Sequence, residues 1–194
     1  MHGLVNRSIQ HFVCDTYGFE IWEDICAEAG LEFTEFEAMM RYDRQYTPDL
    51  VAAMSRLLGR TVAGMMEDLG TYLIMNPSFP AVRRLLRFSG VTFLDFLHSL
   101  DDLPDRVRLA VPDLVLPPMT LYASASDRFH LKCKSTLPGF GHVMLGVLRA
   151  MADDYGALAV LDHVGGANDE ETITITLIET DFARGREFEL GVGT

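Results

Sequence analysis

Residues 3–25 read GLVNRSIQHFVCDTYGFEIWEDI, and this stretch decides the fold. Its first half places apolar residues at the spacing of a single helix face, namely Leu4, Val5, Ile9, Phe12 and Val13. Gly18 interrupts this pattern and Gly30 ends the next one, as glycine often does just beyond the C-terminus of a helix. The sequence therefore predicts two helices, over 3–15 and 19–29.

The same spacing continues through the first half of the chain. It predicts four more helices, within residues 47–59, 61–75, 80–90 and 92–103. Thr47 is the expected N-cap of the first of these, with Pro48 in the first helical position and Gly59 after its end. In the last of them, Phe93 and Leu97 should face inward together with Leu100.

The pattern changes after the prolines at positions 112, 117 and 118. Residues 119–135, MTLYASASDRFHLKCKS, predict a β-hairpin that turns near Ser126–Asp127. A helix over Pro138–Tyr155 and two strands, over residues 157–164 and 171–180, should follow. Helices followed by strands of this kind indicate an α+β fold with an antiparallel sheet.

The composition limits the class of protein. The chain has 194 residues, 48% of them apolar, so it can bury a sizeable core and keep apolar surface for a ligand or partner. A net charge of −12 disfavours nucleic acid and anionic membranes as partners. We expect a cytoplasmic protein, because no signal peptide or membrane span is recognisable and three unpatterned cysteines suit reduced thiols.

Several charged or ligating groups invite a site but are expected to be structural. The acidic pairs and runs at Asp153–Asp154 and Asp169–Glu171 should be solvated. His11 and Cys14 would share a helix face, which is only half of a zinc site, whereas His130 and Cys133 point to opposite faces of a strand. No nucleophile, base and orienting group can be assembled, so an enzyme is not expected.

Four stretches together resemble the H-NOX family, the haem nitric-oxide/oxygen-binding domains of bacteria and of soluble guanylate cyclase. They are residues 1–31, 47–59, 96–118 and 138–148. The resemblance implies a helical N-terminal subdomain, about residues 1–60, packed on a helix-and-sheet subdomain, 61–180, with a four-stranded antiparallel sheet and a tail at 181–194. In the family, a pocket between the subdomains encloses haem.

The resemblance implies a histidine that supplies an imidazole to the haem iron. In the family pattern this histidine lies eight residues before a proline, which here is Pro112, so Pro104 stands in its place. Proline offers iron no lone pair, and inside a helix it costs about 3 kcal/mol, so the helix should break or kink there. Pro117 matches the family proline that presses on the macrocycle.

The family also holds the haem propionates with a Tyr-x-Ser-x-Arg motif directly before the turn that opens the next helix. At that position this chain has Cys133, Ser135 and Leu137, so only the serine is kept. The similar YASAS at 122–126 lies too early in the chain to be the motif. Strand alternation puts Phe129, Leu131, Cys133 and Ser135 on one face and His130, Lys132 and Lys134 on the other. The lysines therefore cannot easily replace the arginine.

Three other side chains could ligate iron in principle. His98 faces about 120° away from the direction of position 104 and is expected to be a surface histidine. Cys133 should point into the pocket, where a thiolate is a competent ligand but a small buried apolar residue is the more common role. His142, on the distal side in the family, should be an ordinary residue of a helix start.

The family counterparts of a further set of residues surround the macrocycle. The expected pocket is therefore lined by Leu4, Val5, Leu73, Leu97, Pro104, Pro117, Cys133, Ser135, Leu137, Val143 and Met144. An empty haem-sized void would cost about 24 cal/mol per Å³, so another apolar molecule or a collapse of the subdomains is expected in place of haem.

The sequence thus predicts a sensory domain of the H-NOX fold that does not bind haem in the family manner. Two alternatives stay open: a haem gas sensor with a non-standard ligand, and a ligandless scaffold for protein interaction. Stand-alone bacterial members of the family report to a histidine kinase or a cyclic-di-GMP enzyme, so the resemblance implies a partner of that kind.

Overall fold

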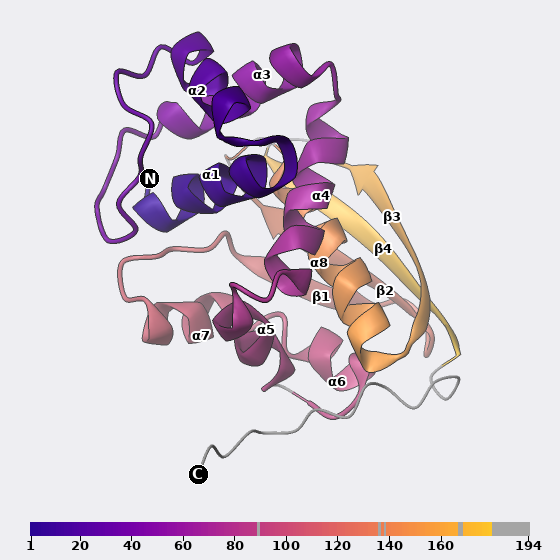
Figure 1. The fold of residues 1–194 in the computed structure, drawn as a ribbon. Helices are drawn as coiled ribbons and strands as arrows, with labels where there is room; N and C mark the ends of the chain where they lie inside the picture. The colour runs from indigo at the N-terminus through magenta and orange to yellow at the C-terminus, as the bar shows by residue number, and fades with distance from the viewer. Residues whose placement is uncertain (89, 136, 138, 167–168, 180–194) are drawn as a thin grey trace.

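A computed structural model describes residues 1–88, 90–135, 137, 139–166 and 169–179 (Figure 1). Its helices are α1 (Gly3–Tyr17), α2 (Phe19–Glu28), α3 (Tyr46–Leu58), α4 (Val62–Met75), α5 (Pro80–Arg87), α6 (Phe93–His98), α7 (Leu103–Ala110) and α8 (Phe140–Tyr155). Helices α1–α3 gather at one end of α4 and α5–α7 at the other (Figure 1). None of the helices in the described ranges is both long and apolar enough to cross a membrane.

The sheet consists of β1 (Met119–Ala123), β2 (Arg128–Lys134), β3 (Leu158–Gly165) and β4 (Glu170–Glu179). Its four strands run in the order β1-β2-β4-β3, and every neighbouring pair is antiparallel. Helix α8 packs on one face of this sheet and contacts α4 on its other side (Figure 1). The predicted α+β class and antiparallel sheet are confirmed. The predicted tail, 181–194, lies outside the described residues, as does Pro138, the expected first residue of α8.

The buried apolar residues form two clusters. One is built on α1–α4 and contains Trp22, whose indole Nε1 donates a hydrogen bond of 2.6 Å to the carbonyl of Thr34. The other lies between α8, the sheet and α5–α7, and it contains Phe93, Leu97 and Leu100, as predicted.

Thr47 is not the N-cap that the sequence predicts. Helix α3 begins one residue earlier, at Tyr46, and Thr47 is completely buried inside its first turn. The Thr47 hydroxyl donates a hydrogen bond of 2.6 Å to Oδ1 of Asn6 on α1. The hydroxyl joins two helices through the core, because burial makes a side-chain partner on α1 worth more than a local backbone cap.

The predicted break or kink at Pro104 is not found, because the helix ends earlier and Pro104 lies inside a new one. Helix α6 ends at His98 and a separate helix, α7, begins at Leu103 with Pro104 as its second residue. In the first turn of a helix the backbone N–H groups have no partner within the helix, so a proline there costs no hydrogen bond. The helix predicted over 92–103 is therefore shorter, at Phe93–His98, and α7 is an additional helix that follows it.

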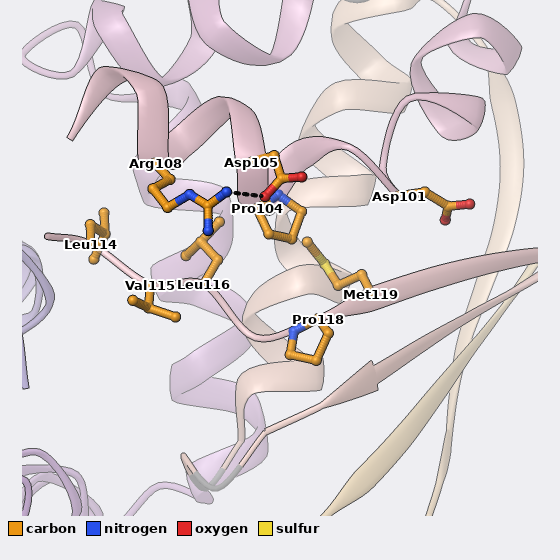
Figure 2. Close-up of a pocket in the computed structure, with 9 residues that line it drawn as sticks. All are labelled: Asp101, Pro104, Asp105, Arg108, Leu114, Val115, Leu116, Pro118 and Met119. Atoms are coloured by element: carbon orange, nitrogen blue, oxygen red, sulfur yellow. Dashed lines mark ion pairs between the residues drawn. The ribbon is translucent and has the colours of Figure 1, made fainter. Parts of the chain in front are cut away.

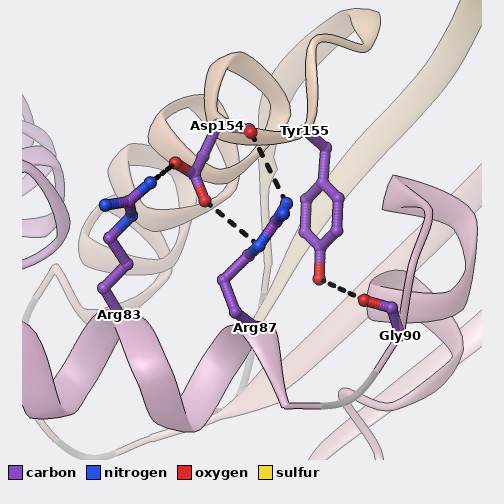
Figure 3. A network of polar contacts seen from close by, with 5 residues as sticks. All are labelled: Arg83, Arg87, Gly90, Asp154 and Tyr155. Carbon is purple, nitrogen blue, oxygen red and sulfur yellow. Dashed lines mark hydrogen bonds and ion pairs between the residues drawn. The ribbon is translucent and has the colours of Figure 1, made fainter. Parts of the chain in front are cut away.

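A buried ion-pair network fastens α5 to the end of α8 (Figure 3). The Asp154 carboxylate accepts a hydrogen bond from Arg83, and Arg87 Nε lies 3.5 Å from its second oxygen. Arg87 also stacks on the ring of Tyr155, whose hydroxyl donates to the carbonyl of Gly90 at 3.1 Å. The expectation that Asp154 is solvated is wrong, because the C-terminal turn of α8 is covered by α5 and only Asp153 points outward.

We predict that Asp154→Ala lowers the free energy of unfolding by about 3 kcal/mol, because it removes a buried carboxylate that contacts both guanidinium groups. Asp153→Ala, an exposed neighbour on the same helix, should change stability by less than about 0.5 kcal/mol. Urea denaturation followed by circular dichroism measures both. Equal effects of the two substitutions would show that the network contributes nothing specific.

Candidate functional site

The residues predicted to line one pocket are divided between the two cores. Leu97, Cys133 and Met144 are buried in the C-terminal core and Leu137 packs against it. Leu73 and Val143 pack against the N-terminal core. Leu4 and Val5 on α1 are half-buried, as are Pro104, Pro117 and Ser135.

A groove of about 310 Å³ lies beside Pro104 (Figure 2). Its walls are α7 and the segment leading into β1, and the lining residues are Asp101, Pro104, Asp105, Arg108, Leu114, Val115, Leu116, Pro118 and Met119. The ring of Pro104 faces Pro118 and Met119 across it (Figure 2). Of the predicted pocket residues, only Pro104 lines this groove.

The three residues at the propionate motif have local structural roles. Cys133 is fully buried in the core between the sheet and α8. The Ser135 hydroxyl accepts a hydrogen bond of 3.0 Å from the amide of Leu137, and the Ser135 amide donates to the carbonyl of Asp169 at 2.8 Å. The strand alternation is as predicted: Phe129 and Leu131 are buried with Cys133.

Two of the three alternative iron ligands lie in unfavourable settings. His98 is exposed, as predicted, and its ring edge meets Phe129 with 5.7 Å between centroids. Burial, reinforced by the negative charge of Glu171, raises the pKa of the Cys133 thiol to about 12, so this group stays a thiol at neutral pH. Neither residue therefore presents a ready ligand at the position of Pro104.

His142 is more than a helix-start residue. Its ring stacks on that of His163 of β3, with 3.9 Å between centroids and 27° between planes. His163 Nε2 lies 2.7 Å from Oε2 of Glu171 on β4. The expectation that the acidic run at 169–171 is a solvated turn is wrong for Glu171, because β4 begins at Glu170 and directs the Glu171 side chain to the face covered by α8. Sequence spacing gives no signal for this cluster, since its members come from three separate elements.

We predict that the thiols differ sharply in alkylation. Burial raises the pKa of Cys26 and of Cys133 to about 12, and it also raises the pKa of Cys14, whose side chain is only half-buried. At pH 8 the folded-state thiolate fraction of either buried thiol is about a thousandfold below that of a thiol at its ordinary value of 9.0, and it rises about tenfold per pH unit toward pH 12. Peptide mapping after iodoacetamide treatment should therefore find Cys14 modified first, and all three cysteines modified after denaturation. Alkylation of native Cys133 as fast as that of Cys14 would contradict the buried placement.

Solved structures show the same fold. An H-NOX protein from S. oneidensis in the Fe(II) ligation state has a TM-score of 0.79 at 14% identity, covering 94% of this chain and 100% of that one. The unliganded Fe(II) H-NOX protein from K. algicida has a TM-score of 0.77 at 17% identity, covering 95% and 100%.

Sequence relatives point the same way. Soluble guanylate cyclase 89Db of Drosophila melanogaster is 25% identical over 164 residues, 84% of this chain and 24% of that protein. Soluble guanylate cyclase gcy-35 of Caenorhabditis elegans is 32% identical over 104 residues, 53% of this chain and 15% of that protein. The chain thus spans about a quarter or less of the length of the curated relatives it matches. A family model described as haem-NO-binding matches residues 2–161, and the chain belongs to that family.

Proposed function

We propose that this chain is a sensory domain of the H-NOX fold that works without haem bound in the family manner. The observation that carries the proposal is Pro104, which stands where the family pattern places the iron-ligating histidine and opens α7. Its pyrrolidine ring lines the groove beside Pro118 and Met119 and offers iron no lone pair (Figure 2).

The propionate side of the site also fits haem poorly. Leu137 replaces the arginine, and Glu171 lies directly opposite Cys133 in the register of β2 and β4. Lys132, on the other face of β2, is paired with Glu170 at 3.0 Å. A haem carboxylate placed here would meet negative charge and apolar side chains, which disfavour it through repulsion and desolvation.

The molecule that this domain senses could be an apolar compound other than haem. Leu4 and Val5 of α1 and Leu73 of α4 are half-buried apolar residues on the N-terminal side. On the C-terminal side, Leu114 and Leu116 line the groove and are also half-buried. Half-buried apolar side chains of this kind can contact an apolar small molecule, which is the preferred occupant. The ligandless scaffold is the alternative.

The effector on which this domain acts is inferred from its relatives. The fly and worm proteins are named soluble guanylate cyclases, and this chain matches only about a quarter or less of each of them. A domain of this size would act on a separate or attached effector of the cyclase or histidine-kinase kind. The domain itself serves as a sensor and not as a catalyst.

We predict that the protein, expressed with haem precursor supplied, shows no Soret band and takes up added haemin only weakly and without saturation. The reason is the combined lack of an iron ligand at Pro104 and of a cation at Leu137. A visible spectrum before and after gel filtration tests this. A one-to-one haem complex that survives gel filtration would refute the proposal and support the haem sensor with a non-standard ligand.

Solvent extraction of the denatured protein, followed by mass spectrometry, distinguishes a domain that holds an apolar ligand from a ligandless scaffold.

We predict that Pro104→His with Leu137→Arg binds haem at least about tenfold more tightly than either single substitution, since iron ligation and propionate pairing act on the same molecule. Pro104→His should be nearly neutral for stability. A backbone N–H in the first turn of α7 has no partner within the helix, so replacing the proline there restores no helix hydrogen bond. Adding Cys133→Tyr completes the family motif, but that position is fully buried and a larger side chain there costs about 1–3 kcal/mol. Haemin titration of folded variants measures the effect. A folded double variant that binds no more haem than the native chain would mean that the space itself is filled.

A further inference from the structure

We propose that His142, His163 and Glu171 form a binding site for a divalent transition-metal ion of the zinc type. The three side chains come from α8, β3 and β4, and each offers one ligand atom; these atoms all lie within 4.8 Å of one another. The His163 and Glu171 side chains are only 14% and 19% exposed. The cluster is separate from the Pro104 groove, and the proposal does not depend on the ligand of that groove.

The backbone is shaped to let these groups converge. Gly141 precedes His142, and a Cβ atom at this position would lie 2.4 Å from Oε2 of Glu171 and 2.8 Å from Nε2 of His163. Any other residue would push the carboxylate or the imidazole away. The pairing of β3 and β4 is irregular between His163 and Gly165, a kind of bulge that re-aims side chains beside functional sites.

The donor set suits zinc. Two imidazole nitrogens and one carboxylate oxygen are the ligands of many three-residue zinc sites, in which a water completes the tetrahedron. Tetrahedral Zn²⁺ at about 2.0–2.2 Å from each ligand needs neighbouring donor atoms about 3.3 Å apart. His163 Nε2 and Glu171 Oε2, now 2.7 Å apart, need to separate only slightly. The His142 ring must turn out of its stack on His163 so that both nitrogens point to one centre.

Metal binding at His163 requires one proton of its ring to change position. The Gly165 amide donates to Nδ1 of His163 at 3.3 Å, so neutral His163 carries its proton on Nε2 and donates it to Glu171. A metal ion at Nε2 displaces that proton, which moves to Nδ1, and the long contact with Gly165 is lost. A contact of 3.3 Å is weak, so this loss is small compared with a metal–nitrogen bond.

The setting of the His142 ring leaves it available to an ion. Burial, followed by the proximity of His163, lowers the pKa of His142, while the negative charges of Glu171 and Glu67 act in the opposite direction. Among the described residues, no hydrogen bond involves the His142 ring, and Glu67 is already paired with Arg149 at 3.0 Å. The cluster thus offers one carboxylate and two imidazoles to one ion.

The decisive experiment is a titration of the full chain, stripped with EDTA and dialysed, with zinc chloride against a chromophoric zinc chelator. We expect one site with a dissociation constant of about 1 µM or tighter and a rise in Tm on adding zinc but not magnesium. His163→Ala, His142→Ala and Glu171→Gln should each weaken binding at least about tenfold and abolish the rise in Tm. Glu171→Gln keeps the shape of the side chain and a hydrogen bond to His163, so it remains informative if His163→Ala fails to fold.

Two matched controls make the assignment specific. His130→Ala removes a histidine on the opposite face of β2, and His11→Ala removes the histidine near Cys14 on α1. Both should bind zinc as the native chain does. With Co²⁺ in place of zinc, the visible spectrum should lack thiolate charge-transfer bands, because no cysteine takes part. Lack of one-to-one binding below about 1 mM zinc, retention of binding in Glu171→Gln and His163→Ala, or loss of binding in His11→Ala would each overturn the proposal.

Discussion

The close crossing of α4 and α8 is the contact on which the rest of the structure depends. A Cβ atom at Gly70 would lie 2.0 Å from the carbonyl oxygen of Val143, and one at Gly146 would lie 2.0 Å from that of Glu67. The two helix backbones therefore touch, and only glycine fits at either point. Helix α4 contributes Met65 and Leu69 to the N-terminal core, whereas α8 supplies much of the C-terminal core. This crossing joins the two cores by direct backbone contact.

The elements were predictable because their signals are local. The apolar spacing of residues 3–25 and the alternation around Cys133 are read along the chain, and both agree with the structure. Thr47 and Asp154 were assigned wrongly from equally local signals. Their partners, Asn6, Arg83 and Arg87, are far away in sequence, and burial by α1 or α5 decides their roles. Polar residues in a core are the point at which one-dimensional reasoning fails, since partners replace solvent only after folding.

The candidate site also has some features that the sequence predicts and others that it does not. Pro104 and Leu137 could be singled out from the sequence because the family pattern has fixed spacing. A residue that replaces the histidine or the arginine is therefore recognised by its distance from the other residues of the pattern. The predicted pocket residues are divided between the two cores, and a pattern cannot tell whether Cys133 faces a cavity or the core behind it. The cluster of His142, His163 and Glu171 could not be found at all. It depends on the irregular pairing of β3 and β4 and on the absence of a side chain at Gly141.

One pair of residues in the sheet connects the position of the propionate motif with the proposed metal cluster. Cys133 and Glu171 are partners in the register of β2 and β4, and the charge of Glu171 adds to the burial that raises the pKa of the Cys133 thiol. The Glu171 carboxylate also lies close to the imidazoles of His142 on α8 and His163 on β3. A negative charge at this end of the sheet attracts a cation and repels a carboxylate. The proposed metal site and the proposed absence of family-type haem binding therefore rest on the same side chain.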